Sequence, residues 1–201
     1  MQQELNYYSN SEDFLKALTF FYAANQGNKL FSHNDHIKPM PSELYVNREI
    51  TVSGGKKQLL IGSTDNETGV TNFDGNKLED GRAFVINGVT VKIGIGDKKA
   101  KPYNVDFLTG ITKEQKVPFQ FANIVLKQQD EILVRMPLLS IENGKKDFSE
   151  YRDIALTLIT PGPKVEVELE FPDDVVAPTL DDGKTFFVSA VFRGFESYQK
   201  R

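Results

Sequence analysis

Alternation of apolar and polar side chains is the feature of this chain that most restricts its fold. The clearest example is residues 164–171, where the apolar residues are Val165, Val167, Leu169 and Phe171. The residues between them are Lys164, Glu166, Glu168 and Glu170. Successive side chains of a strand point to opposite faces, so this segment predicts a strand with one face in a core and the other in water.

Similar patterns and turn residues predict further strands. Residues 82–95 hold two β-rich runs around Asn87-Gly88, which indicates either a type I′ hairpin or one long strand with a kink. Residues 124–127 and 132–134 flank Gln128-Gln129-Asp130 and predict a second hairpin.

A third strand pair is expected to meet across Pro161-Gly162-Pro163, with residues 154–160 on one side and 165–171 on the other. The prolines would end the ladder and force a bend. Further strands are expected near residues 49–52, 59–62, 103–108 and 185–195. The expected total of about eight to ten strands, without helices between them, predicts an all-β sandwich or barrel.

A helix is expected only near the start of the chain, over about residues 10–25. Ser9-Asn10-Ser11-Glu12 fits a capping box, and Gly27 fits a left-handed stop. The helix would carry an apolar stripe at helical spacing, formed by Phe14, Leu18, Phe21 and Tyr22. This stripe must be buried, either on its own domain or on a neighbouring subunit, and we predict that it is an interface.

The chain therefore divides into two parts. Residues 1–47 are expected to form an N-terminal helical arm and connector, with Pro39 and Pro41 in the connector, and residues 48–201 a single β-sandwich domain. No repeat and no low-complexity segment divides the second part further.

Composition excludes some classes of partner. The 201 residues include 24 basic and 28 acidic residues, a net charge of −4, so direct binding to nucleic acid is not expected. No apolar run approaches the roughly 20 residues that cross a bilayer, and no basic-then-apolar leader opens the chain, so we expect neither an integral membrane contact nor signal-peptide export. The absence of cysteine fits a reducing cytoplasm.

No pattern of residues indicates catalysis or a cofactor. His33 and His36, with Asp35 between them, have a spacing that could hold a metal on a helix, but the surrounding residues predict a loop. Asp173-Asp174 and Asp181-Asp182, with the acids of residues 63–82, could supply calcium ligands but match no regular calcium loop. Residues 94–99 resemble a phosphate loop only in their glycines. We therefore expect no cofactor and no enzyme activity.

Aromatic residues leave a second function open. The chain has fifteen phenylalanines and seven tyrosines but no tryptophan, which is the most effective platform for stacking a sugar. A sandwich that binds carbohydrate or peptide through exposed tyrosines is the alternative function. The candidates for such a platform are Tyr7, Tyr8, Tyr103 and Tyr198.

Three segments carry a resemblance to a known family. They are residues 117–126, residues 132–138 and residues 186–196, the last of which includes Arg193-Gly194-Phe195-Glu196. Together they resemble the jelly-roll coat proteins of tailless bacteriophages. The resemblance implies an antiparallel β-sandwich of jelly-roll type and a structural role in the virion. It also implies that the partners are copies of the chain itself and other virion proteins, with no small-molecule substrate and no catalytic residues.

Overall fold

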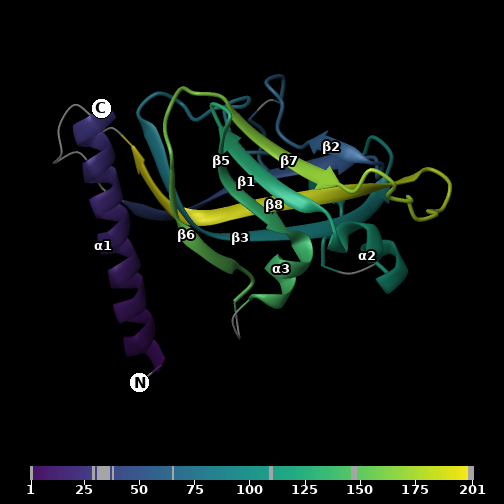
Figure 1. The fold of residues 1–201 in the computed structure, drawn as a ribbon, viewed down its shortest axis with the longest axis horizontal. Helices are drawn as coiled ribbons and strands as arrows, with labels where there is room; N and C mark the ends of the chain where they lie inside the picture. The colour runs from purple at the N-terminus through teal and green to yellow at the C-terminus, as the bar shows by residue number, and fades with distance from the viewer. Residues whose placement is uncertain are drawn as a thin grey trace.

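The computed structural model describes residues 2–28, 30, 37, 39–64, 66–108, 111–145 and 149–198. Within these residues eight strands form two four-stranded antiparallel sheets. The first sheet contains β1 (Met40–Ile50), β8 (Lys184–Tyr198), β3 (Arg82–Asp97) and β6 (Arg152–Ile159), in that order. The second contains β2 (Gly55–Gln58), β7 (Val165–Phe171), β4 (Asn123–Gln128) and β5 (Glu131–Pro137), in that order. The prediction of a β-sandwich with an N-terminal helix is confirmed (Figure 1).

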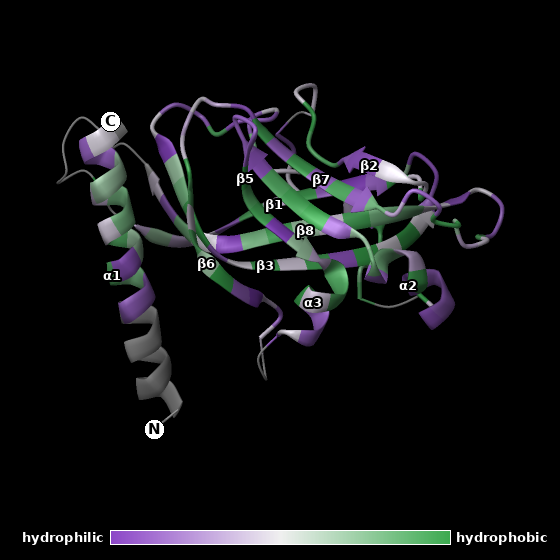
Figure 2. Ribbon diagram, in the orientation of Figure 1, coloured by the Kyte–Doolittle hydropathy of each residue, from purple (hydrophilic) through white to green (hydrophobic). Residues whose placement is uncertain are grey.

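The main core fills the space between the two sheets. The four apolar residues of β7 that alternate with charged ones are all buried in this core, as the sequence pattern predicts. In β8 the inward positions are Phe186, Val188, Ala190 and Phe192. Figure 2 shows the resulting alternation of apolar and polar residues along the strands. Burial of these side chains is the main stabilising contribution to the sandwich.

The two β-rich runs around Asn87-Gly88 form one long strand, β3. The register of β3 against β8 shifts between Ile86 and Gly88, so Asn87 is the extra residue of a β-bulge. Before the bulge the inward residues of β3 have even numbers, and after it they have odd numbers, beginning at Val89. Of the two interpretations of this segment, the kinked strand is confirmed and the hairpin is wrong.

The two other predicted strand pairs have different outcomes. β4 and β5 form the predicted hairpin, and its two turn residues, Gln129 and Asp130, have φ values of 50° and 65°, which a type I′ turn requires. The pairing of β6 with β7 is wrong, because β6 pairs with β3 in one sheet and β7 pairs with β2 and β4 in the other. Pro161-Gly162-Pro163 therefore carries the chain from one sheet to the other.

Three of the remaining strand predictions need correction. β1 begins at Met40, so residues 40–47 of the expected connector belong to the first sheet. Residues 59–62 follow strand β2 instead of forming one. Residues 103–108 do not form a strand: the 3-10 helix η2 (Pro102–Asn104) begins this segment, where Val105 packs against Gly94 and Gly96 of β3. The fourth, residues 185–195, lies inside β8 and is confirmed.

The N-terminal helix is longer than its end signals suggest. α1 spans Gln2–Asn28, so Ser9 to Glu12 lie inside the helix and are not its cap, and Gly27 does not end it. Figure 1 shows α1 across one end of the sandwich.

Two short helices cover the sandwich on the side away from α1, and neither of them was predicted. α2 (Lys113–Gln120) begins with a capping box between Thr112 and Gln115, and it buries Phe119 against Phe171 and Phe186, with ring centroids 5.5 and 5.2 Å apart. α3 (Leu138–Asn143) buries Leu138 and Ile141 in the same core. Both helices lie away from α1 (Figure 1).

Candidate interaction surface

The predicted interface stripe of α1 packs against the sheet of its own chain. Phe21 is fully buried in a second apolar cluster with Ala83, Val85 and Phe195 on the outer face of the first sheet. The Phe14 ring meets the Phe195 ring edge to face, with centroids 6.4 Å apart. Leu18 and Tyr22 are partly buried against the same cluster. The structure therefore brings all four predicted residues together, and their contacts within the chain occupy this side of the helix.

The Arg193-Gly194-Phe195-Glu196 segment lies beside this contact. Gly194 faces the β3 bulge, where a Cβ atom would lie 1.9 Å from the carbonyl oxygen of Val85. Phe195 supports α1 on the outer face. Glu196 points the other way, between the sheets. The segment thus links β8 to β1 and β3 of the first sheet and to α1.

A buried ion pair closes this end of the sandwich. Arg82 Nε donates to Glu196 Oε1 at 2.6 Å, and both side chains are less than a tenth exposed. Ser42 Oγ donates to the other carboxylate oxygen at 2.6 Å. A buried charge pair with these additional hydrogen bonds is satisfied, whereas the loss of one partner would leave a charge without compensation.

Polar side chains link α1 to the sheet through the bulge. Asn87 donates to Asp13 of α1 at 3.4 Å and accepts from Arg193 Nε at 3.2 Å. Arg193 also donates to Asp153 at 2.9 Å, and its guanidinium lies 5.0 Å from the centre of the Tyr151 ring. Tyr151 donates a hydrogen bond to Glu43, and burial and then this hydrogen bond raise the pKa of Tyr151 above its ordinary value.

The outer face of the second sheet is a network of opposite charges. Lys127 Nζ donates to Glu168 at 2.8 Å, and Arg135 donates to Glu170 at 2.7 Å. Glu168 is only 3% exposed, so the prediction that this face of β7 is uniformly wet is wrong at this position. The neighbouring Lys164 donates a hydrogen bond to Glu166 and lowers its pKa. On this face each of the three glutamates of β7 is therefore paired with a lysine or an arginine.

Each sheet edge carries a feature that discourages strand addition. The 67–73 segment covers β1, with Asn47 N donating to Val70 O at 2.7 Å. β2 has four residues, two of which are lysines. The registers of β5 against β4 and of β6 against β3 both shift, which breaks the regular ladder near the outer edge of each sheet. Contacts between copies are therefore better served by side chains than by strand pairing.

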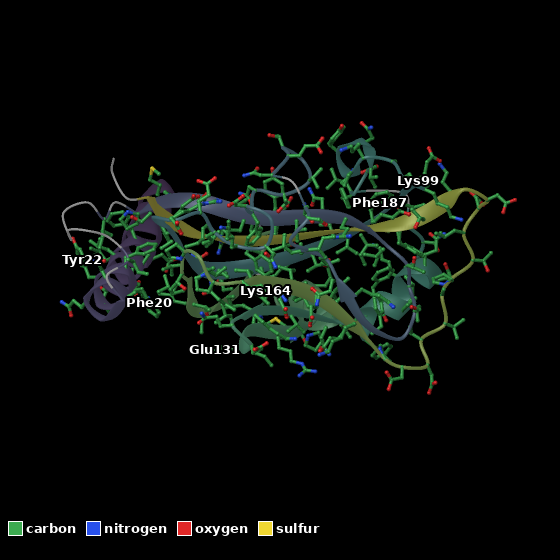
Figure 3. The ribbon with its side chains drawn as sticks, turned by 90° about the horizontal axis from the view of Figure 1, so that it is seen from above. Phe20, Tyr22, Lys99, Glu131, Lys164 and Phe187 are labelled. Carbon is green, nitrogen blue, oxygen red and sulfur yellow. The ribbon has the colours of Figure 1, made fainter. Side chains whose placement is uncertain are left out.

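Exposed large apolar residues include side chains on α1 and around α2 and α3, as well as Met40, Tyr103, Ile132 and Val176. On α1, Leu15 is 60% and Phe20 38% exposed; because they are five positions apart, they lie roughly 140° apart around the helix, one on each flank of its buried side. Figure 3 shows Phe20 at one end of the molecule and Lys99 at the other. The exposed residues around α2 and α3, which we term the groove patch, are Leu108, Val117, Phe121 and Leu139. Exposed apolar clusters of this kind mark contacts with other molecules.

The groove patch borders a groove with a volume of about 410 Å³. Its apolar lining includes Ile93 of β3, Phe119 of α2 and Leu138 of α3. Its charged residues form two ion pairs, Lys92 with Glu150 at 2.6 Å and Lys145 with Glu142 at 2.9 Å, and Lys116 adds a further positive charge. Sequence reasoning missed this groove. The Thr112 to Gln115 capping box was the available signal for its α2 wall.

The residues considered as metal ligands do not assemble a site in the part of the chain that the structure describes. His33, Asp35 and His36 lie outside the described residues. Among those that are described, no three or more His, Cys, Asp or Glu side chains come close enough to hold a metal ion. Residues 94–97 belong to β3 and lead into a turn at residues 98 and 99, so the N-terminus of a helix does not directly follow them as a phosphate site would require. No helix in the described ranges is long and apolar enough to span a membrane.

Of the four tyrosines proposed as a ligand platform, the structure describes the side chain of Tyr103. The side chains of Tyr7, Tyr8 and Tyr198 lie outside the described part of the chain. Tyr103 is about half exposed and lies against Gly69.

Comparison with known proteins adds no assignment to this geometry. Protein-family models, curated protein sequences and solved structures give no match to the chain.

Proposed function

We propose that this chain is a structural subunit of a bacteriophage virion, built as a single jelly roll that assembles with copies of itself and with other virion proteins. The strand order carries this proposal. Strands β1, β8, β3 and β6 face β2, β7, β4 and β5, an order expected when two Greek keys fold into eight strands, as in the jelly rolls of viral capsids.

Two further observations support a structural role. The segments that resemble tailless-phage coat proteins contribute α2, β4, β5 and β8 to the sandwich, so they are parts of its framework. Exposed apolar residues lie on α1 and around α2 and α3, on different sides of the sandwich, an arrangement that suits repeated contacts between identical subunits.

Electron microscopy of the concentrated recombinant protein tests this function. We expect closed, symmetric assemblies, because identical contacts related by a fixed rotation close into rings or shells. Glycan-array binding by a protein that forms no assemblies would instead favour a carbohydrate-recognition module and overturn the proposal.

A second experiment uses phage particles purified from a host that carries the gene for this chain. Mass spectrometry should detect the chain in these particles at a fixed number of copies per particle. Its absence from intact particles would contradict a virion location.

A further inference from the structure

We propose that the part of β3 beyond β6 receives an extended segment of another protein, which adds to the first sheet as a strand in line with β6. This inference rests on the proposed function and names the contact by which the subunit would hold another virion protein. Strand pairing, burial and the groove beside α2 and α3 all support it at the same place.

Strand β3 is longer than the strand at its side. β8 pairs with β3 along Arg82–Asp97, whereas β6 pairs only with residues 84–89. Figure 1 shows β3 continuing past the end of β6. Alternate backbone groups of an antiparallel strand point to opposite neighbours, so the groups of residues 91–95 that point away from β8 face no described strand. Among the described residues, no backbone group of a helix or loop hydrogen bonds to residues 91–95 instead.

Burial of β3 falls where β6 ends. The inward residues Phe84, Ile86 and Val89, which β6 flanks, are fully buried in the core between the sheets. Val91 and Ile93 point into the same core but are only partly buried. Since a strand on each side normally covers an inward side chain, this change indicates that the edge of β3 is open here.

The groove has the walls that an added strand requires. Residues 91–93 line it, and Phe119 of α2 and Leu138 of α3 form a wall that belongs to the core between the sheets. Phe107 lines it on the other side, where it packs against Gly94 on the outer face of β3. Successive side chains of a strand point to opposite faces, so both faces of a segment bound here would meet apolar walls. A free strand edge between apolar pockets is a recurring site for extended peptides.

Charge narrows the chemistry of the segment. Lys92 pairs with Glu150 at 2.6 Å and Lys145 with Glu142 at 2.9 Å, whereas Lys116 has no ion pair among the described residues. The lining therefore carries one net positive charge, which favours a negative group on the partner. The expected segment is a short run of apolar residues with a carboxylate at one end.

The segment is expected from another protein and not from a second copy. All eight described strands already pair within one of the two sheets of their own chain. The described loop between β7 and β8 is a poor strand, because Pro172 and Pro178 lack the N–H groups that a ladder requires.

A displayed library of random linear peptides, selected on the wild-type protein, tests the site. We expect it to yield peptides with the composition given above. Leu139→Glu places a charge in the lining of the groove and should weaken their binding roughly tenfold or more. Ile132→Glu is the matched control, because Ile132 is an exposed apolar residue of β5 outside the groove lining, and it should bind like the wild type. Calorimetry measures binding, and circular dichroism checks that each variant is folded.

Backbone N-methylation of a selected peptide distinguishes strand addition from other modes of binding. Each methyl group removes one amide donor, so binding should weaken at every second position and stay unchanged at the positions between. In the protein, those amides of residues 91–95 that do not bond to β8 should exchange more slowly once the peptide is bound. Sensitivity without a period of two, or unchanged exchange, would overturn strand addition.

The remaining outcomes separate this site from the proposed function. If the library yields no peptide, or if its peptides bind Leu139→Glu as tightly as the wild type, the strand site is wrong while the virion role stands. If the peptides bind as expected but the chain is absent from phage particles, the virion role fails and the strand site stands. Self-association that a selected peptide inhibits would identify the occupant as a second copy and contradict its assignment to another protein.

Discussion

Gly194 is a position in β8 at which no side chain fits. A Cβ atom there would lie 1.9 Å from the Val85 carbonyl oxygen and 2.8 Å from Phe84 Cε1, so the bulge would have to open. We expect Gly194→Ala to lower the free energy of unfolding by about 1–3 kcal/mol or more, as overpacking does. Urea denaturation measures this change.

Gly27→Ala is the control for that substitution. Nothing lies within 4 Å of a Cβ atom at Gly27, and the residue is helical, so the alanine should stabilise α1 by up to about 1 kcal/mol. Equal stability of the Gly194→Ala variant and the wild type would show that β3 and β8 are not in close contact at the bulge.

The buried pair of Arg82 and Glu196 gives a second prediction at this scale. Arg82→Met leaves the Glu196 carboxylate buried without its cation, and we expect a loss of about 3–5 kcal/mol. Arg82→Met combined with Glu196→Met should be less destabilised than Arg82→Met alone, because the buried charge is removed. A double-mutant cycle by chemical denaturation measures the coupling, and additive losses would contradict it.

At the scale of residues, the sequence identified important positions in β8 but not the contacts that make them important. Arg193 to Glu196 stood out through a resemblance. The need for glycine at position 194 comes from the backbone of Val85, 109 positions away in the chain, and the need for Glu196 comes from the guanidinium of Arg82. Such partners are set by strand register, which no local pattern contains. The bulge at Asn87 could be predicted only as one of two possibilities.

At the scale of elements, the docking of α1 can be separated from the folding of the sandwich. Phe21 belongs to the second apolar cluster, on the outer face of the first sheet, and not to the core between the two sheets. Phe21→Ala should therefore cost about 3–5 kcal/mol of docking free energy, and hydrogen exchange should become faster in α1 while β7 stays protected.

The adjacent Phe20 supplies the control, because its side chain is exposed. Phe20→Ala should leave exchange in α1 close to that of the wild type. Loss of protection in β7 on replacing Phe21 would mean that helix and sandwich fold as one unit.

The charged face of β7 predicts a dependence on pH. Lys164 lowers the pKa of Glu166 in the folded chain, so this pair stabilises the fold above the unfolded pKa of about 4.5. The contribution is lost as the pH falls through the lower, folded pKa. Because solvent screens this pair, we expect the effect on stability to be small.

Thermal unfolding of the wild type and of Glu166→Gln measures this effect. The wild type should unfold at the higher temperature at neutral pH, and the difference should disappear in acid. A difference that is constant with pH would show that the pair does not act through ionisation of Glu166.

Elements were predictable where their signal is local and continuous. The alternation in β7 and the turn between β4 and β5 identify these strands directly. α2 and α3 were missed because eight and six residues are too few for helical periodicity to stand out. The start of α1 was misplaced because a capping signal is outweighed when the helix continues on both sides of it.

At the scale of the whole molecule, the sequence predicted that apolar faces must be buried, but not which surfaces bury them. It required the stripe of α1 to be buried and left open whether the surface belongs to its own domain or to a neighbour. The structure places the stripe on its own first sheet, against residues more than 60 positions away. The groove was beyond prediction, since its walls come from β3, α2 and α3.

The central claim is that the chain works by associating with copies of itself. Light scattering of the wild-type protein after size-exclusion chromatography, over a series of concentrations, tests it most directly. We predict a molar mass that rises with concentration to a defined multiple of the 22.7 kDa chain. A mass that stays at 22.7 kDa at every concentration would contradict the account.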